Sequence, residues 1–200
     1  MDLFISSFLK IFFIMTPFFV LSVFLTVTQD ATIKERKSLA IKVTISVVVT
    51  SLILLFFGKH IFSIFGITLD AFRIGAGALL FISAVELVKG SKESTKIGKK
   101  DISQLAVVPL AIPITIGPGT IGILLVMGAT FENTSSMLVG SLSLVSAVLA
   151  IGIMLYSSSF IENIIGKQGL LVISKITGLF LAALSAQIVF TGIKNFLGLE

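Results

Sequence analysis

The sequence PLAIPITIGPGTIG, residues 109–122, decides the fold of this chain. It holds three of the four prolines and lies inside an uncharged run, residues 105–127, long enough to cross a bilayer as a helix. Proline lacks the backbone N–H and clashes with the carbonyl one turn earlier, so Pro113 and Pro118 predict an interrupted helix. Irregular backbone at membrane depth persists only where it is buried in protein or lines a wet cavity. The stretch is therefore a candidate binding site, and a proline kink absorbed by helix packing is the alternative.

The composition of the 200-residue chain is typical of an integral membrane protein. Hydrophobic residues make up 56%, charged residues only 12%, and the mean hydropathy is +1.13, whereas soluble domains carry about 25% charged residues. The chain has no cysteine and a single histidine, His60. We therefore expect no metal centre and no cofactor. An enzymatic activity is not expected either, because no nucleophile–base pair stands out.

Six apolar segments of helical length follow one another, whereas the strands of a β-barrel would be shorter and alternating. They cover residues 11–27, 43–57, 72–88, 105–127, 137–156 and 170–190. Residues 61–67 are too short to span and predict an interfacial piece before the third segment. The N-terminal segment lacks the basic start and cleavage site of a signal peptide, so we expect it to be retained. The predicted fold is one all-α transmembrane domain, residues 1–200, with six helices.

The basic residues, which give the net charge of +5, predict the orientation of these helices rather than nucleic-acid binding. Eleven fall on one side: Lys34, Arg36, Lys37, Lys42, Lys89, Lys92, Lys96, Lys99, Lys100, Lys167 and Lys175. Four fall on the other: Lys10, Lys59, Arg73 and Lys194. Positive residues favour the cytoplasm, so both termini are predicted to lie outside and residues 90–102 to form a cytoplasmic loop.

The chain also contains an internal repeat. Residues 73–84, RIGAGALLFISA, match residues 175–186, KITGLFLAALSA, at an offset of 102, and Thr16-Pro17 matches Gly117-Pro118 at 101. Repeat A then covers about residues 1–90 and repeat B about residues 103–200, with three spans each. An odd number of spans inserts the second repeat upside down, as in many secondary transporters with broken helices. The alternative is that Ile, Ala, Gly and Ser recur by chance in apolar helices.

Breaks in the first and fourth helices would leave backbone groups unpaired inside the bundle. The N-terminus of a half-helix carries partial positive charge that suits a carboxylate, and free carbonyls suit an ammonium group, so a small zwitterion would match both. The predicted substrate-binding residues are Thr16, Pro17, Pro113, Thr115, Gly117, Pro118, Gly119, Thr120 and Gln187. Gln187 has an alternative role as a polar packing residue. The Gly-Pro-Gly-Thr sequence lacks the Lys-Ser/Thr end of a phosphate loop.

Glu86 is the only acid deep in an apolar segment. Intramembrane acids are functional candidates, but Glu86 lies one turn before Lys89, and an interfacial ion pair between these two residues is the favoured interpretation. Because no Asp, Glu or Arg is centrally placed, the sequence gives little support to proton coupling.

The residues quoted above resemble the MarC family of six-span bacterial inner-membrane proteins. The resemblance rests on VPLAIPITIGPGTI (108–121), FGITLDAFRIGAG (65–77) and KITGLFLAALSAQ (175–187), and it extends over essentially the whole chain. It implies a small transporter, since some relatives are assigned as neutral amino acid transporters or exporters. One departure concerns the first helix, where relatives often carry Asn-Pro-x-Gly-Asn-x-Pro and this chain has TPFFVLS, residues 16–22. The first-helix half of the site is therefore expected to be more apolar.

The sequence therefore predicts a secondary carrier of small neutral amino acids that works by alternating access around broken helices. Its partners would be the solute and the lipid bilayer, without nucleic acid, and a homo-oligomer is compatible with the sequence. Two alternatives stay open: an exporter of drugs or other apolar solutes, and a non-transporting regulatory membrane protein.

Overall fold

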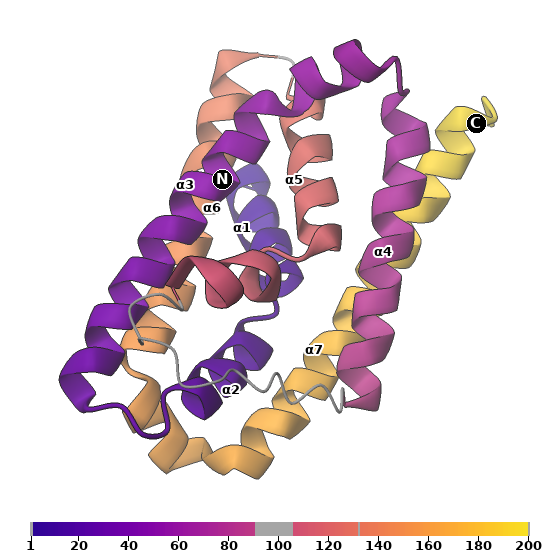
Figure 1. Cartoon of the computed structure of the whole chain (residues 1–200). Helices are drawn as coiled ribbons and strands as arrows, with labels where there is room; N and C mark the ends of the chain where they lie inside the picture. The colour runs from indigo at the N-terminus through magenta and orange to yellow at the C-terminus, as the bar shows by residue number, and fades with distance from the viewer. Residues whose placement is uncertain (1, 91–105, 132, 200) are drawn as a thin grey trace.

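The computed structural model describes residues 2–90, 106–131 and 133–199, and within these ranges every regular element is a helix (Figure 1). The elements are α1 (Asp2–Ile14), α2 (Pro17–Val27), α3 (Ile33–Phe65), α4 (Leu69–Lys89), the π-helix η2 (Ala106–Thr115), α5 (Pro118–Thr130), α6 (Thr134–Tyr156) and α7 (Ser158–Phe196). By length and composition, α4, α6, α7 and the Ile33–Gly58 part of α3 can each cross a membrane, and the bent pair α1–α2 makes up to five candidate spans.

The first predicted segment is a pair of helices, α1 and α2, bent by 40°. The predicted start at residue 11 is wrong, because α1 already begins at Asp2. Lys10 interrupts the apolar pattern without interrupting the helix, since its side chain is exposed while Ile11 and Ile14 are buried. The fourth predicted segment is also divided, with η2 ending at Thr115 and α5 beginning at Pro118.

The long helix α3 extends well beyond the predicted segment 43–57. Its start is fixed by a capping box, in which the Thr32 hydroxyl accepts from the Glu35 N–H and the Glu35 carboxylate accepts from the Thr32 N–H. Most of the predicted interfacial piece, residues 61–67, is the end of this helix, which stops at Gly66 in the left-handed conformation (φ 62°). Figure 1 shows the last turns of α3 running across the top of the molecule toward α4.

The last helix, α7, begins 12 residues before the predicted start at residue 170, at Ser158. Its only internal departure from helical geometry is Gly166, at φ 70° and ψ 165°. Glu162 and Lys167 lower the local hydropathy around this kink, so the segment does not register as apolar although it is helical. Hydropathy therefore marked the lipid-depth part of α7 and missed its first turns.

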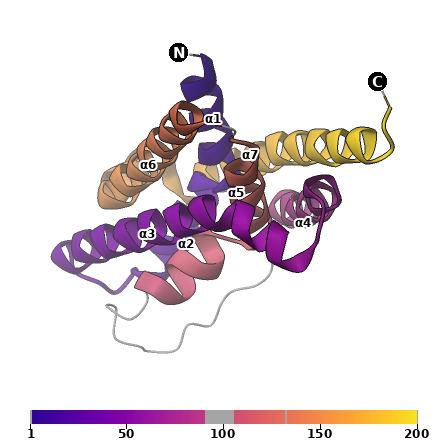
Figure 2. The same cartoon turned by 90° about the horizontal axis from the view of Figure 1, so that it is seen from above.

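Small residues set the distances between the helices. Two glycines lie in the interface between α4 and α7. A Cβ on Gly77 of α4 would meet the Val189 side chain, and a Cβ on Gly192 of α7 would meet the Asp70 carbonyl. α3 contacts α5 through Gly128, which lies against the backbone of Leu55. Seen from above (Figure 2), α3 and α6 lie on one side, α4 and α7 on the other, and α5 stands between them.

The outward faces of the long helices are apolar. Ile45, Val49 and Ile53 recur every four residues along α3 and are each more than half exposed, and Ile153 of α6 and Phe180 of α7 are exposed in the same way. Faces of this kind are stable in hydrocarbon and unstable in water. The molecule is therefore built to be surrounded by lipid.

Candidate functional site

The first break lies between α1 and α2. The Met15 N–H donates to the Ile11 carbonyl at 3.0 Å, and the Thr16 N–H donates to the Phe13 carbonyl at 3.0 Å, which tightens the last turn of α1. Thr16 then adopts the left-handed conformation, φ 48° and ψ 57°, and Pro17 begins α2. In a continuous helix the carbonyl of Ile14 would accept the N–H four residues later. The new start at Pro17 leaves that carbonyl available to a partner outside the helix.

The second break follows the wide turns of η2. The Ile116 N–H donates to the Ala111 carbonyl at 2.9 Å, five residues back, and the Thr115 hydroxyl donates to the Leu110 carbonyl at 2.7 Å. Gly117 is the N-cap of α5 in an extended conformation, φ −77° and ψ 172°, and Pro118 is the first helical residue. Proline is well suited to this position because the first N–H groups of a helix have no intrahelical partner.

The two breaks meet inside the bundle. The hydroxyl of Thr120, in the first turn of α5, donates to the carbonyl of Ile14 at 3.5 Å across 106 residues of sequence. Thr120 is 4% exposed, so this long hydrogen bond is shielded from solvent. A side chain of one broken helix therefore satisfies a backbone group that the other break has freed.

A cavity of about 200 Å³ lies beside this contact, between α1, α4, α5 and α7. Ile14 lines it, so the cavity reaches the residue whose carbonyl Thr120 binds. Its wall is apolar except for two cations, one amide and one hydroxyl. The lining residues are Lys10, Ile14, Arg73, Ile123, Val126, Met127, Leu184, Gln187, Ile188 and Thr191.

The charge at this cavity is net positive. The Arg73 guanidinium is paired with Asp70, with Nη1 2.6 Å from Oδ1, and the same carboxylate oxygen accepts from Asn195 Nδ2 at 3.3 Å. Lys10 adds a second cation on α1. The charged side chains at the cavity are therefore two cations, of which Arg73 is paired with the Asp70 carboxylate.

The comparison with protein-family models identifies the family of the chain. The model of the "MarC family integral membrane protein" family matches residues 1–197. The chain belongs to the MarC family. It is 33% identical over 199 residues to a UPF0056 membrane protein of Methanocaldococcus jannaschii, covering 96% of this chain and 87% of the relative.

Further relatives of this MarC-family protein have the same extent. A UPF0056 membrane protein of Aquifex aeolicus is 33% identical, with 98% of this chain and 94% of the relative covered. The UPF0056 membrane protein YhcE of Escherichia coli is 29% identical, with 96% and 92% covered. No solved structure matches the chain.

Most of the predicted site residues of this MarC-family protein lie at the two breaks. Thr16 and Pro17 cap and begin α2, Gly117 and Pro118 cap and begin α5, and Thr120 joins the two breaks. Gln187, predicted from α7, is an exposed residue that lines the cavity with Ile14. Pro113 lies within η2, and its side chain is outside the described part of the structure.

Two predicted residues of the MarC-family site have structural partners. The Thr115 hydroxyl is buried and bonded to the Leu110 carbonyl inside η2. Gly119 is buried against α4, where an added Cβ would lie 2.8 Å from the Leu80 Cα. The glycine thus allows α4 and α5 to approach closely, and neither Thr115 nor Gly119 lines the cavity.

The predicted ion pair between Glu86 and Lys89 is absent, although both residues lie in the described part of the chain. The ion pairs found among the described residues are Arg36–Glu162 and Arg73–Asp70. Both Glu86 and Lys89 are exposed at the end of α4. A lysine on an exposed helix end extends its ammonium group toward water instead of back along the helix.

Two further polar residues, one at the cavity and one in the packed core, were not predicted. Lys10 was read as a topology signal, yet it lines the cavity. Ser51 of α3 is fully buried, and its hydroxyl has no hydrogen-bond partner among the described residues. It lies one turn before Leu55, on the face of α3 that packs against α5. A serine in an apolar helix was visible in the sequence, but the face it occupies was not.

Proposed function

We propose that this MarC-family protein is a secondary carrier of small neutral amino acids that works by alternating access around the two helix breaks. The observation that carries the proposal is the hydrogen bond from Thr120 to the Ile14 carbonyl beside a cavity that Ile14 and Gln187 also line. A solute in that cavity would lie next to exchangeable polar groups of both breaks. Breaking and remaking this bond gives a bound solute a way to alter how the two halves contact each other.

We further propose that the fold is a six-span inverted repeat, in which η2 and α5 together form the fourth span in chain order. The contacts support this pairing. α1 packs on α6 as η2 packs on α3, and α2 packs on α7 as α5 packs on α4. The pairs α4–α7 and α3–α6 also pack together and would each be related to themselves by the repeat. With the excess of basic residues inside, both termini would lie outside the inner membrane.

The chemistry of the site favours a zwitterion. α2 and α5 both begin at the breaks, and their N-termini carry the partial positive charge that a carboxylate prefers. The Ile14 carbonyl and the Thr120 hydroxyl are acceptors for an ammonium group. The cations Lys10 and Arg73 at the cavity would draw the carboxylate end of a solute inward.

The size of the cavity favours a small solute over the alternative of a drug exporter. Sites for drug-sized ligands usually measure about 300–1,000 Å³, and the cavity here is about 200 Å³. Its apolar wall, which includes Ile123 and Leu184, suits the short side chain of a neutral amino acid. A regulatory protein without transport activity would have no need for this cavity, and the flux experiment separates that alternative directly.

The test is flux of labelled alanine, serine and leucine into proteoliposomes that contain the purified protein, with protein-free liposomes as the blank. We expect Thr120→Val to keep the fold and to lower the flux about tenfold or more, because a bound solute loses its partner hydroxyl. Thr130→Val is the matched control. Thr130 lies at the other end of α5, where its hydroxyl bonds the Val126 and Met127 carbonyls at 2.8 and 2.9 Å.

The outcomes separate the candidate functions. Flux that depends on the protein and falls only in Thr120→Val supports the carrier. Equal flux in Thr120→Val and Thr130→Val would remove the site from the mechanism. Absence of flux for every amino acid offered would favour the regulatory alternative, and flux of an apolar drug alone would favour the exporter.

A further inference from the structure

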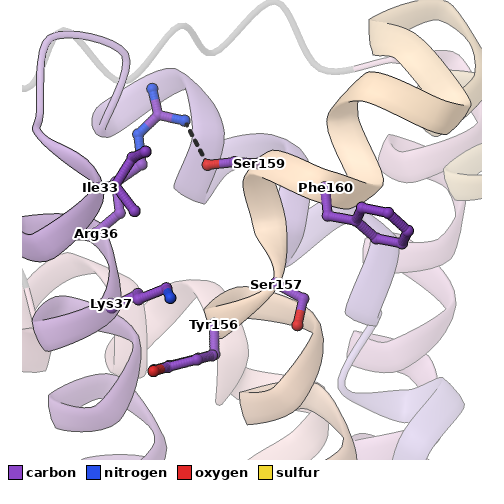
Figure 3. Close-up of a pocket in the computed structure, with 7 residues that line it drawn as sticks. All are labelled: Ile33, Arg36, Lys37, Tyr156, Ser157, Ser159 and Phe160. Atoms are coloured by element: carbon purple, nitrogen blue, oxygen red, sulfur yellow. Dashed lines mark hydrogen bonds between the residues drawn. The ribbon is translucent and has the colours of Figure 1, made fainter.

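A second cavity, of about 260 Å³, lies where the beginning of α3, the end of α6 and the beginning of α7 meet (Figure 3). It shares no lining residue with the cavity beside the helix breaks. The lining residues are Ile33, Arg36, Lys37, Tyr156, Ser157, Ser159 and Phe160. Ile33 is the first residue of one candidate span and Tyr156 the last residue of another. The cavity therefore lies at the depth where a membrane changes from hydrocarbon to headgroups.

Arg36 is held in place at one wall of this cavity. Its Nε donates to the Thr28 carbonyl at 2.9 Å, its Nη2 to the Gln29 carbonyl at 3.2 Å, and its Nη1 to the Ser159 hydroxyl at 3.4 Å. The Glu162 carboxylate lies 3.8 Å from Nη1, and the Arg36 side chain is 16% exposed. The guanidinium is thus already ordered before any ligand binds, which lowers the entropic cost of binding.

A second cation faces the same cavity. The Lys37 ammonium lies 4.8 Å from the centre of the Tyr156 ring, so the aromatic face orients it. Arg36 and Lys37 together outnumber the single carboxylate of Glu162. Ser157 and Ser159 add hydroxyl donors at the start of α7 (Figure 3). Two cations and two hydroxyls around one cavity are the donor set that a phosphate group requires.

The rim of the cavity is apolar. Ile33 is 66% exposed and Phe160 67% exposed, and Ile153 lies exposed one turn before the end of α6. A soluble phosphate would make no favourable contact with this apolar rim, whereas the acyl chains of a lipid would lie along it. The combination of a basic, hydroxyl-rich interior and an apolar rim selects an amphipathic anion.

We infer that this cavity binds the phosphate headgroup of an anionic phospholipid, with Lys37, Arg36 and the hydroxyls on the phosphate and with Ile33 and Phe160 against the acyl chains. Basic pockets between membrane helices are a known setting for such headgroups. On the proposed orientation the cavity opens to the cytoplasmic leaflet. The site does not depend on the transport function, since it shares no residue with the helix breaks.

The chain offers an internal reporter for the test. Tyr156 is the single tyrosine, and the sequence contains no tryptophan. Tyrosine fluorescence of the purified protein in neutral detergent therefore reports on this cavity alone. We expect a saturable change on addition of phosphatidylglycerol, and none with phosphatidylcholine or with inorganic phosphate at the same concentration. An equal response to phosphatidylcholine would overturn the inference, and an equal response to inorganic phosphate would reassign the site to a soluble anion.

Variants place the binding on the cavity, with native mass spectrometry counting bound phosphatidylglycerol because changes at Lys37 alter the fluorescence baseline. Lys37→Gln is expected to weaken binding about fivefold, the loss of one cation near an anionic surface. Lys34→Gln, three residues away and outside the lining, is expected to leave it unchanged. Arg36 is left unchanged, because its loss would also free the two backbone carbonyls to which it donates. The second variant is therefore Ser159→Ala, which should also weaken binding. Equal losses in Lys34→Gln and Lys37→Gln would reduce the effect to general charge attraction and refute the site.

Discussion

The two helix breaks stand at positions that match in the proposed repeat, and they are built differently. Thr16-Pro17 and Gly117-Pro118 are 101 residues apart, and in both pairs the proline is the first residue of a new helix. Thr16 is the only non-glycine residue with positive φ among the described residues, at 48°, whereas Gly117 lies at −77°. Glycine thus occupies the break whose backbone any residue can adopt, and a β-branched residue occupies the strained one. In both breaks the proline begins the new helix. The residue before it is not the type that its φ angle favours, because glycine would suit the positive φ of position 16 better than position 117.

The side chains in the first helical turn after each break differ in size. α2 begins with Pro-Phe-Phe-Val-Leu and α5 with Pro-Gly-Thr-Ile-Gly. The side chain of Leu21 is fully buried, whereas Gly122 at the matching position has no side chain and lies against Ala76 of α4. One half of the site is therefore packed by large side chains, and the other by close approach of two backbones.

The two halves also differ in polarity. Thr120 of α5 matches Phe19 of α2, so only the second half offers a hydroxyl at this turn. The first half contributes a backbone carbonyl instead, that of Ile14. This agrees with the apolar first-helix motif noted in the sequence. In the hydrogen bond between the two breaks, the donor is a side chain of the second half and the acceptor is a backbone carbonyl of the first half.

The largest effect is expected from filling the glycine of the tightly packed half. Gly122→Leu would force α4 away from α5, because the added Cβ falls on the Ala76 Cβ. We expect a loss of about 3 kcal/mol or more in stability, seen as a strongly lowered midpoint of thermal unfolding in detergent. Gly75→Leu is the control, since a Cβ at Gly75 has no neighbour within 4 Å. Similar midpoints for the two variants would show that the backbones are not in close contact there.

An intermediate effect is expected inside η2. Thr115→Val removes the hydroxyl that donates to the Leu110 carbonyl at 2.7 Å, and it leaves that carbonyl with one partner fewer in a buried position. We expect a loss of about 1–2 kcal/mol, measured by the same unfolding experiment. The matching residue of the first break is Ile14, which has no hydroxyl, so Ile14→Val serves as the comparison and should lose only about 1 kcal/mol from packing. A smaller loss in Thr115→Val than in Ile14→Val would contradict a special role for the hydroxyl.

The smallest effect concerns the backbone strain that distinguishes the two breaks. Asparagine tolerates the left-handed conformation better than threonine, so Thr16→Asn is expected to raise stability by about 1 kcal/mol. The substitution also introduces the Asn-Pro pair that MarC relatives often carry at this position. Gly117→Asn should change stability by only a few tenths of a kcal/mol, about the difference between these two residues as N-caps. A gain at position 117 that matches the gain at position 16 would show that strain is not the cause.

The class of the fold and the position of both breaks were readable from the sequence because they depend on local chemistry. Low charge and long apolar runs require a membrane protein. Pro118 begins a new helix as predicted, whereas Pro113, which was also predicted to interrupt the helix, lies inside the wide turns of η2. The ends of α3 and α7 were not readable from hydropathy, since both helices continue past the apolar run into charged turns. The capping box at Thr32 was present in the sequence, and it would have corrected the start of α3.

The site was predictable in part for the same reason. The sequence predicts Thr120 as a hydroxyl near a break and Gln187 as a polar residue of the last helix, and the structure places Thr120 in the contact between the breaks and Gln187 in the adjacent cavity. The contact of Lys10 with the cavity was missed, because a lysine inside an apolar helix looks the same in sequence whether it faces lipid headgroups or a cavity. The cavity around Lys37 brings residues 33–37 together with residues 156–160, which are more than 100 residues away in the sequence, and no local pattern could indicate it.

The π-helix gives the second half a freedom that the α-helical first half lacks. Its donors reach back five residues, as Ile116 does to Ala111. If one such turn returned to α-helical spacing, each donor would move to the next acceptor, and the side chains beyond would swing by about 100° around the axis. A shift of one residue within Ala106–Thr115 would therefore turn Thr120 away from Ile14 without melting a single turn of α5. The extra residue in the π-helical turn would thus allow the helix to change register by one residue.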